Sequence, residues 1–314
     1  DWSSDVCSSD LIAAWNTTEG AGTPYVTNDE VKFSPTAAAI DFSNLVENDS
    51  QAVQDRALHD LIVRASDMAD RHIYGALGTL SATVNTGSGR YRQNRYGQFV
   101  IHPDYWPILE VRSFSAGIDP GTMNTYSLSS GNTWIERNQF IITADAGLSN
   151  VTTTYGSLGI VGYNQGIDLE QFCQWTYVNG YGNTFLSSAT TVGSTTIPVQ
   201  TVIGFYAGQT VTLWDGMNNE NVSITAVGTS TITIASGLAY PHGTGCNLSA
   251  LPATVKQAVI HLVVGLIKER GQGGIVLNEI GEPTAVGPKT TSYESDLMMG
   301  YDLLDHFRAV WGRS

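Results

Sequence analysis

The chain has 314 residues, 42% of them hydrophobic and 10% aromatic, so it can bury a large core and is not a disordered protein. Its 15 Lys and Arg against 29 Asp and Glu give a formal charge of −14, which disfavours non-specific binding to nucleic acid or anionic membranes. No apolar run approaches the ~20 residues that span a bilayer, so we expect neither a transmembrane segment nor a membrane partner.

Residues 1–11, DWSSDVCSSDL, show no hydrophobic period. The string resembles the conceptual translation of a sequencing-library adapter, so we predict an artefactual leader and a true N-terminus different from the printed one. Outside this leader, Cys173 and Cys246 lie far apart and in no CxxC or Cys/His ligand spacing. The sequence therefore predicts neither a disulfide framework nor a metal site.

Three segments have a helical hydrophobic period. The first runs from Gln51 to Ile73, with Gly75 placed to end it. The second starts at Leu251 and is expected to stop at Gly271. The third, Tyr293 to Trp311, carries one apolar stripe, which consists of Leu297, Tyr301, Leu304, Phe307 and Trp311.

Short alternating runs between these helices predict antiparallel strands and hairpins at residues 98–101, 108–114, 133–143 and 169–178. Residues 89–97 are bounded by glycine, and we interpret them as a loop. Tyrosine and arginine are common at the centres of protein interfaces, and they are also residues that stack on nucleobases. With this net charge we favour a protein interface, formed by Arg90, Tyr91, Arg92, Arg95 and Tyr96.

The block from Thr184 to Leu248 contains no Lys or Arg and is rich in Thr, Val, Ile, Ser and Gly. Alternation at residues 195–199, 209–214, 220–227 and 230–235 predicts a small all-β module of four or five strands. Residues 215–220 look superficially like a calcium loop, but they lack its alternating ligand positions, so we predict a hairpin turn.

Together these patterns predict an α+β fold, in which two to three amphipathic helices form a helical core with antiparallel β hairpins and an inserted all-β module. The expected domains are the leader, residues 1–11; an N-terminal helix and β region, residues 12–183; the inserted β module, residues 184–250; and a core helix with a C-terminal docking segment, residues 251–314.

No catalytic motif is present. There is no G-x-S-x-G elbow, HExxH or Walker-type phosphate loop, and the six His residues are scattered. We therefore expect no enzyme activity, no catalytic or metal-binding residues and no cofactor. A hydrolase whose residues converge only in space is a further alternative.

The order of the elements resembles that of tailed-phage head-tail connector proteins, also called adaptor or head-completion proteins. The resemblance rests on residues 62–74 (IVRASDMADRHIY), 107–114 (PILEVRSF), 176–181 (TYVNGY) and 251–271 (LPATVKQAVI to ERG). The block from Thr184 to Leu248 interrupts this pattern. Three of its segments, 207–213, 220–224 and 240–245, resemble a small β module inserted in several phage virion proteins.

This resemblance implies a structural virion protein of the neck, at the head-tail junction, assembled in the host cytoplasm. It implies a homo-oligomeric ring, often twelvefold, between the portal protein and the stopper or tail protein. Genomic DNA would pass through the ring without sequence-specific binding, and an acidic wall suits that passage. The stripe from Leu297 to Trp311 would dock on the portal, and the Arg90 to Tyr96 loop would face a neighbour or the tail side.

The alternative function comes from a different class of virion protein. A capsid decoration protein or tail-tip adhesin would bind its ligand through the inserted β module. Its candidate contacts are Trp214, Asp215 and Tyr240.

Overall fold

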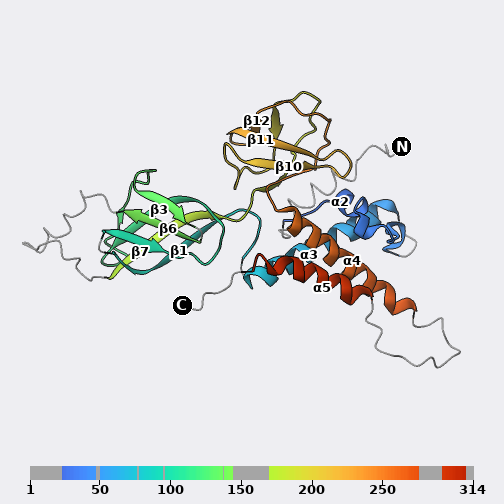
Figure 1. Cartoon of the computed structure of the whole chain (residues 1–314), viewed down its shortest axis with the longest axis horizontal. Helices are drawn as coiled ribbons and strands as arrows, with labels where there is room; N and C mark the ends of the chain where they lie inside the picture. The colour runs from blue at the N-terminus through green and yellow to red at the C-terminus, as the bar shows by residue number, and fades with distance from the viewer. Residues whose placement is uncertain are drawn as a thin grey trace, which may run out of the picture. The chain divides into compact units, whose positions relative to one another are not determined.

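The structure, a computed structural model, describes residues 23–46, 50–75, 78–94, 96–136, 138–143, 170–275 and 292–308. They form two compact units (Figure 1). One is residues 82–180, and the other combines the described residues before 82 with those after 180. The helices are α2 (Asn28–Lys32), α3 (Gln51–Tyr74), α4 (Ala253–Ile275) and α5 (Ser292–Asp305), with short 3-10 turns at Pro35–Ala37 and Phe42–Asn44.

The strands are antiparallel in three sheets. They are β1 (Thr83–Arg92), β2 (Gln98–Ile101), β3 (Ile108–Gly117), β4 (Asn124–Thr125), β5 (Thr133–Glu136), β6 (Gln139–Thr143), β7 (Glu170–Asn179), β8 (Asn183–Phe185), β9 (Thr196–Pro198), β10 (Thr210–Trp214), β11 (Glu220–Val227), β12 (Thr231–Ile234) and β13 (Asn247–Ser249).

The helices pack around one hydrophobic cluster, in which α3 and α4 lie side by side although about 180 residues separate them (Figure 1). The apolar period at Gln51 to Ile73 is confirmed as α3, and Gly75 ends that helix at a positive φ of 77°. The expected stop of the second helix at Gly271 is wrong, because α4 continues to Ile275. A glycine lowers helix propensity by only about 1 kcal/mol, which neighbouring turns can offset.

Helices α4 and α5 approach closely because each places a glycine at the contact. A Cβ on Gly265 would lie 2.7 Å from Leu297 Cδ2, and a Cβ on Gly300 would lie 3.1 Å from the Ala258 carbonyl oxygen. A larger side chain at either position would therefore push the helices apart.

We expect the substitution Gly300→Val to lower the free energy of unfolding by about 1–3 kcal/mol, because it overpacks this contact. Urea denaturation measures the change. The matched control is Gly131→Val, since the nearest atom to a Cβ there is 3.8 Å away. Equal effects at the two positions would contradict a tight α4–α5 contact.

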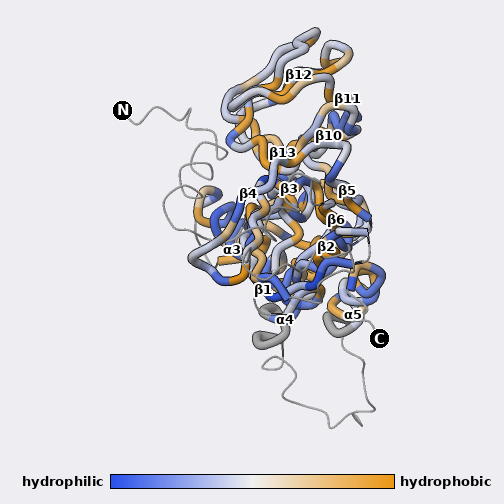
Figure 2. The backbone as a smooth tube through the Cα atoms, turned by 90° about the vertical axis from the view of Figure 1, so that its left-hand side faces the viewer, coloured by the Kyte–Doolittle hydropathy of each residue, from blue (hydrophilic) through white to orange (hydrophobic). Residues whose placement is uncertain are grey.

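The segment from Asn183 to Ser249 forms a six-stranded sheet in the order β8-β13-β10-β11-β12-β9. Its inner residues make a separate hydrophobic cluster that includes Ile197, Leu213, Ile232 and Leu248. Figure 2 shows hydrophobic stretches along β12 and β13. The strands expected at 195–199, 209–214, 220–227 and 230–235 are confirmed as β9 to β12, and the alternation explains them since every second side chain enters the core.

The unit of residues 82–180 contains two sheets, ordered β1-β7-β3-β4 and β2-β6-β5. Aromatic rings from both sheets meet in its core: the ring centroids of Phe99 and Phe114 are 5.3 Å apart, and those of Phe140 and Trp175 are 6.2 Å apart. The strands expected at 98–101, 108–114, 133–143 and 169–178 are confirmed, the third as a hairpin of β5 and β6.

Two strands of this unit, β1 and the two-residue β4, were not predicted. Residues 83–92 form β1, although its glycines favoured a loop. Gly87 pairs with Trp175 on β7, and a Cβ on Gly87 would lie 2.6 Å from that indole ring. The indole thus covers the bare backbone at Gly87, and a contact from a distant strand overrides the low strand propensity.

The expectation of a helical core with an inserted β module is wrong. Strands make up 33% of the structure and helices 27%, in four helices and three antiparallel sheets among the described residues. The physical reason is that the β regions have two hydrophobic clusters of their own and do not depend on a helical core. The expected domain boundaries stay a prediction. Within the described ranges, no helix combines the length and the apolar character needed to cross a bilayer.

Candidate functional site

The residues expected at a protein interface lie on β1 and the turn that follows it. Arg90 and Arg92 are exposed on one face of β1, and Arg92 pairs with Glu170 at 3.4 Å. Tyr91 points to the other face, where its ring meets Trp175 edge-on at 5.5 Å. Tyr96 is 64% exposed, and Arg95 lies outside the described residues. The two described arginines thus belong to a strand surface, and the interpretation as a loop is wrong for this part.

The apolar stripe expected to dock on the portal faces the chain's own helices. Leu304 is fully buried, and Leu297, Tyr301 and Phe307 pack against the same cluster. Trp311 lies outside the described residues. The Tyr301 ring lies 4.7 Å from the imidazole of His72 on α3. Docking through this stripe stays a prediction, and the exposed side of α5 presents Met298 and Met299 instead, 62% and 47% exposed.

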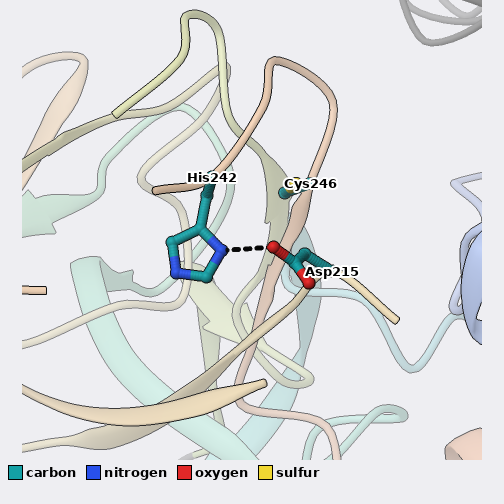
Figure 3. A group of neighbouring side chains, drawn as sticks. All are labelled: Asp215, His242 and Cys246. Carbon is teal, nitrogen blue, oxygen red and sulfur yellow. Dashed lines mark hydrogen bonds and ion pairs between the residues drawn. The ribbon is translucent and has the colours of Figure 1, made fainter. Parts of the chain in front are cut away.

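A cluster of ionisable side chains lies in the β module, where the turn after β10 meets the loop before β13 (Figure 3). His242 Nδ1 is 2.8 Å from Asp215 Oδ2, and His242 Nε2 is 2.7 Å from Glu220 Oε1. The imidazole is fully buried, and the two carboxylates are each 13% exposed. Burial raises the pKa of Glu220, but hydrogen bonds from the Ala239 amide and His242 outweigh it and hold that pKa below its usual value.

Both carboxylates are fixed by backbone amides. Asp215 Oδ1 accepts hydrogen bonds from the amides of Met217 at 3.3 Å and Asn218 at 2.7 Å, so it closes its own turn. Glu220 accepts from Ala239 at 2.9 Å. The expected hairpin turn at residues 215–220 is therefore confirmed, and it aims Asp215 Oδ2 at the imidazole.

Cys246 is the third member of the group, and its thiol, Asp215 and His242 place ligand atoms within 4.8 Å of one another. Burial raises the pKa of this thiol to about 11. The same residue types form catalytic dyads in which a histidine deprotonates a cysteine. Here both imidazole nitrogens face carboxylates, so the geometry does not favour Cys246 as a nucleophile.

The sequence analysis missed this cluster. His242 and Cys246 are four residues apart in a glycine-containing loop, a spacing that the search for Cys/His pairs passed over. Asp215 lies 27 residues before His242. Only the pairing of β10 with β11 and β13 brings these positions together.

The residues expected to contact a ligand in the adhesin alternative are mostly engaged within the chain. Lys256 Nζ lies 4.6 Å from the centre of the Trp214 ring, and Asp215 is bound by His242. Tyr240, 46% exposed, is the one of the three that is open to solvent.

No protein-family model matches the chain, and no curated protein sequence does so either.

Proposed function

We propose that this chain is a structural virion protein, a head-tail connector that forms a ring between the portal and the stopper or tail. The sequence resemblance to tailed-phage connectors is the origin of the proposal. In this role the chain is not an enzyme, and its acidic surface limits adhesion of DNA that passes through the ring.

The observation that carries the proposal is the distribution of exposed apolar side chains. A closed ring needs two different patches on each copy, because its contacts run head to tail. Large exposed hydrophobic side chains occur on both compact units. In residues 82–180 they are Val84, Tyr96, Ile118 and Ile135, and in the other unit they are Phe33, Val192, Tyr206, Met217, Tyr240, Met298 and Met299.

The adhesin alternative has less support. A glycan would stack on an open aromatic face, but Lys256 covers one face of the Trp214 ring. A buried hydrogen bond from Lys256 on α4 to Asn247 on β13 also joins the β module to the helices. A rigid connection of this kind suits a part of a larger assembly.

Native mass spectrometry and negative-stain imaging of the protein without residues 1–11 test the proposal, with the protein alone and then with the portal protein of the same phage. We expect a ring, or a monomer that becomes a ring on the portal. A monomer or trimer that ignores the portal would favour the decoration or adhesion function.

We also propose that α5 contacts the portal with its exposed face. The double substitution Met298→Ser/Met299→Ser should weaken portal binding at least tenfold, since each buried Met side chain contributes about 1.5–3 kcal/mol. The control is Met217→Ser, 74% exposed on the β module. These exposed positions are better probes than removal of α5, which would also remove the buried Leu304. Unchanged binding in the double variant would exclude this face as the contact.

A further inference from the structure

In the cluster of Asp215, Glu220, His242 and Cys246, a neutral His242 has too few N–H groups for the carboxylates that it contacts. A neutral imidazole has one N–H donor and one nitrogen lone pair. Both nitrogens of His242 lie within 2.8 Å of a carboxylate oxygen. With only one N–H on the ring, one nitrogen lone pair would face an oxygen lone pair. The contact between Nδ1 and Asp215 Oδ2 therefore needs a second proton, on the ring or on the carboxyl group, or a cation that binds both atoms from one side.

The position of Cys246 favours the cation. An imidazolium between two carboxylates is complete without a sulfur atom, yet the thiol lies within 4.8 Å of the ligand atoms of both Asp215 and His242. Sulfur, imidazole nitrogen and carboxylate oxygen are the three ligand types that zinc takes in proteins. Figure 3 shows the three side chains converging from different segments of the module.

Glu220 occupies the position of an outer-shell partner. A metal-bound histidine almost always donates its second N–H to a carboxylate or carbonyl, which fixes the ring orientation. Here Nε2 faces Glu220, and the backbone amide of Ala239 holds that carboxylate. Nδ1 is thereby directed toward Asp215 and Cys246.

The charge around the cluster also favours a cation. Gly216, next to Asp215, lies against Phe33 and Asp29 of the α2 region. The acids of this neighbourhood are Asp29, Glu30, Asp55, Asp215 and Glu220, and the bases are Lys32 and Lys256. The acids outnumber the bases, so a divalent ion would reduce the net charge.

We infer that Asp215, His242 and Cys246 bind a divalent transition metal of the zinc class, with Glu220 orienting His242. When the ion binds, the Cys246 thiol releases its proton to solvent, as does any proton on His242 Nδ1, and metal–sulfur and metal–nitrogen bonds form in their place. Asp215 binds through an oxygen lone pair, and Nε2 keeps its proton for Glu220. Three protein ligands leave a fourth position for water. The ion would fasten the turn after β10 to the loop before β13, and this structural role is independent of the proposed ring.

Titration of the full chain with zinc chloride, followed by calorimetry, tests the inference. We expect one zinc ion per chain. Cys246→Ser should weaken binding at least tenfold, and Glu220→Gln should weaken it by about 10–100-fold. Cobalt chloride is the spectroscopic probe, because a cobalt–thiolate bond gives a near-ultraviolet charge-transfer band that Cys246→Ser should abolish.

The matched controls are Cys7→Ser and Cys173→Ser, which remove the chain's other two thiols and should leave both signals unchanged. Circular dichroism checks that each variant folds, and Asp215→Asn replaces any variant that does not. Zinc binding that is equal in the wild type and in Cys246→Ser would overturn the inference. So would the absence of binding, and a proton would then fill the contact between His242 and Asp215.

Discussion

Replacement of Lys256 by methionine should lower the free energy of unfolding by about 3–5 kcal/mol, because it leaves a buried carboxylate without its counter-ion. Lys256 is 2% exposed, and its Nζ lies 2.7 Å from both Glu30 Oε1 and Asn247 Oδ1. Burial lowers the pKa of this lysine, while Glu30 opposes that shift. The ammonium joins α4 to α2 and to β13, so its loss affects the helices and the β module together.

Urea denaturation measures this change, and Arg64→Met is the matched control. Arg64 also pairs with a carboxylate, that of Asp60 at 2.7 Å, but its side chain is 60% exposed. Its removal should cost less than about 0.5 kcal/mol. The double variant Glu30→Gln/Lys256→Met should recover much of the loss, since neither charge remains. A cost for Lys256→Met no larger than that for Arg64→Met would show that the buried pair contributes as little as a surface pair.

Local pattern predicted most elements of this fold, and contacts between distant segments explain the errors. Residues 98–101 and 220–227 show the alternation of a half-buried strand, and both boundaries agree with β2 and β11. Strand β1 shows a weaker strand pattern because it contains glycines. The contact that covers Gly87 comes from Trp175 on a distant strand, so local pattern does not reveal it. The fold class was wrong because β1 was missed and because the helices were expected to form the main core of the chain. In the structure each β region has a hydrophobic core of its own.

The candidate metal cluster could be predicted only in part. His242 and Cys246 are four positions apart in the chain, and that spacing was visible in the sequence. The part played by Asp215 and Glu220 was not visible, because it depends on the register of β10 with β11 and β13. For the docking stripe, the sequence predicted the helix but not what its apolar face contacts. Its helical period is real, but a period alone does not say whether Leu304 meets a partner or the chain's own core.

The second large effect concerns pH and Asp70. This carboxylate on α3 accepts hydrogen bonds from the Tyr25 hydroxyl at 2.5 Å and the Leu80 amide at 2.8 Å, so it joins three segments. Burial raises its pKa to about 7, against the opposing effect of these hydrogen bonds. The folded state therefore keeps a proton between pH 4 and 7 that the unfolded chain has lost. Stability falls as the pH rises through this range and levels off above it.

The shift in pKa corresponds to at most about 4 kcal/mol at neutral pH, at roughly 1.4 kcal/mol per unit. Asp70→Asn keeps an acceptor for Tyr25 and Leu80 but cannot ionise. Its stability relative to the wild type should therefore increase by a few kcal/mol between pH 4 and 8 in urea denaturation.

Asp67→Asn is the control, since Asp67 is 52% exposed and pairs with Arg71. The difference in stability between this variant and the wild type should not change with pH. His59, whose pKa burial lowers to about 4, acts in the opposite direction, but it is present in all three proteins and cancels in the differences. A flat difference for Asp70→Asn as well would mean that Asp70 ionises in the folded protein as readily as in the unfolded chain.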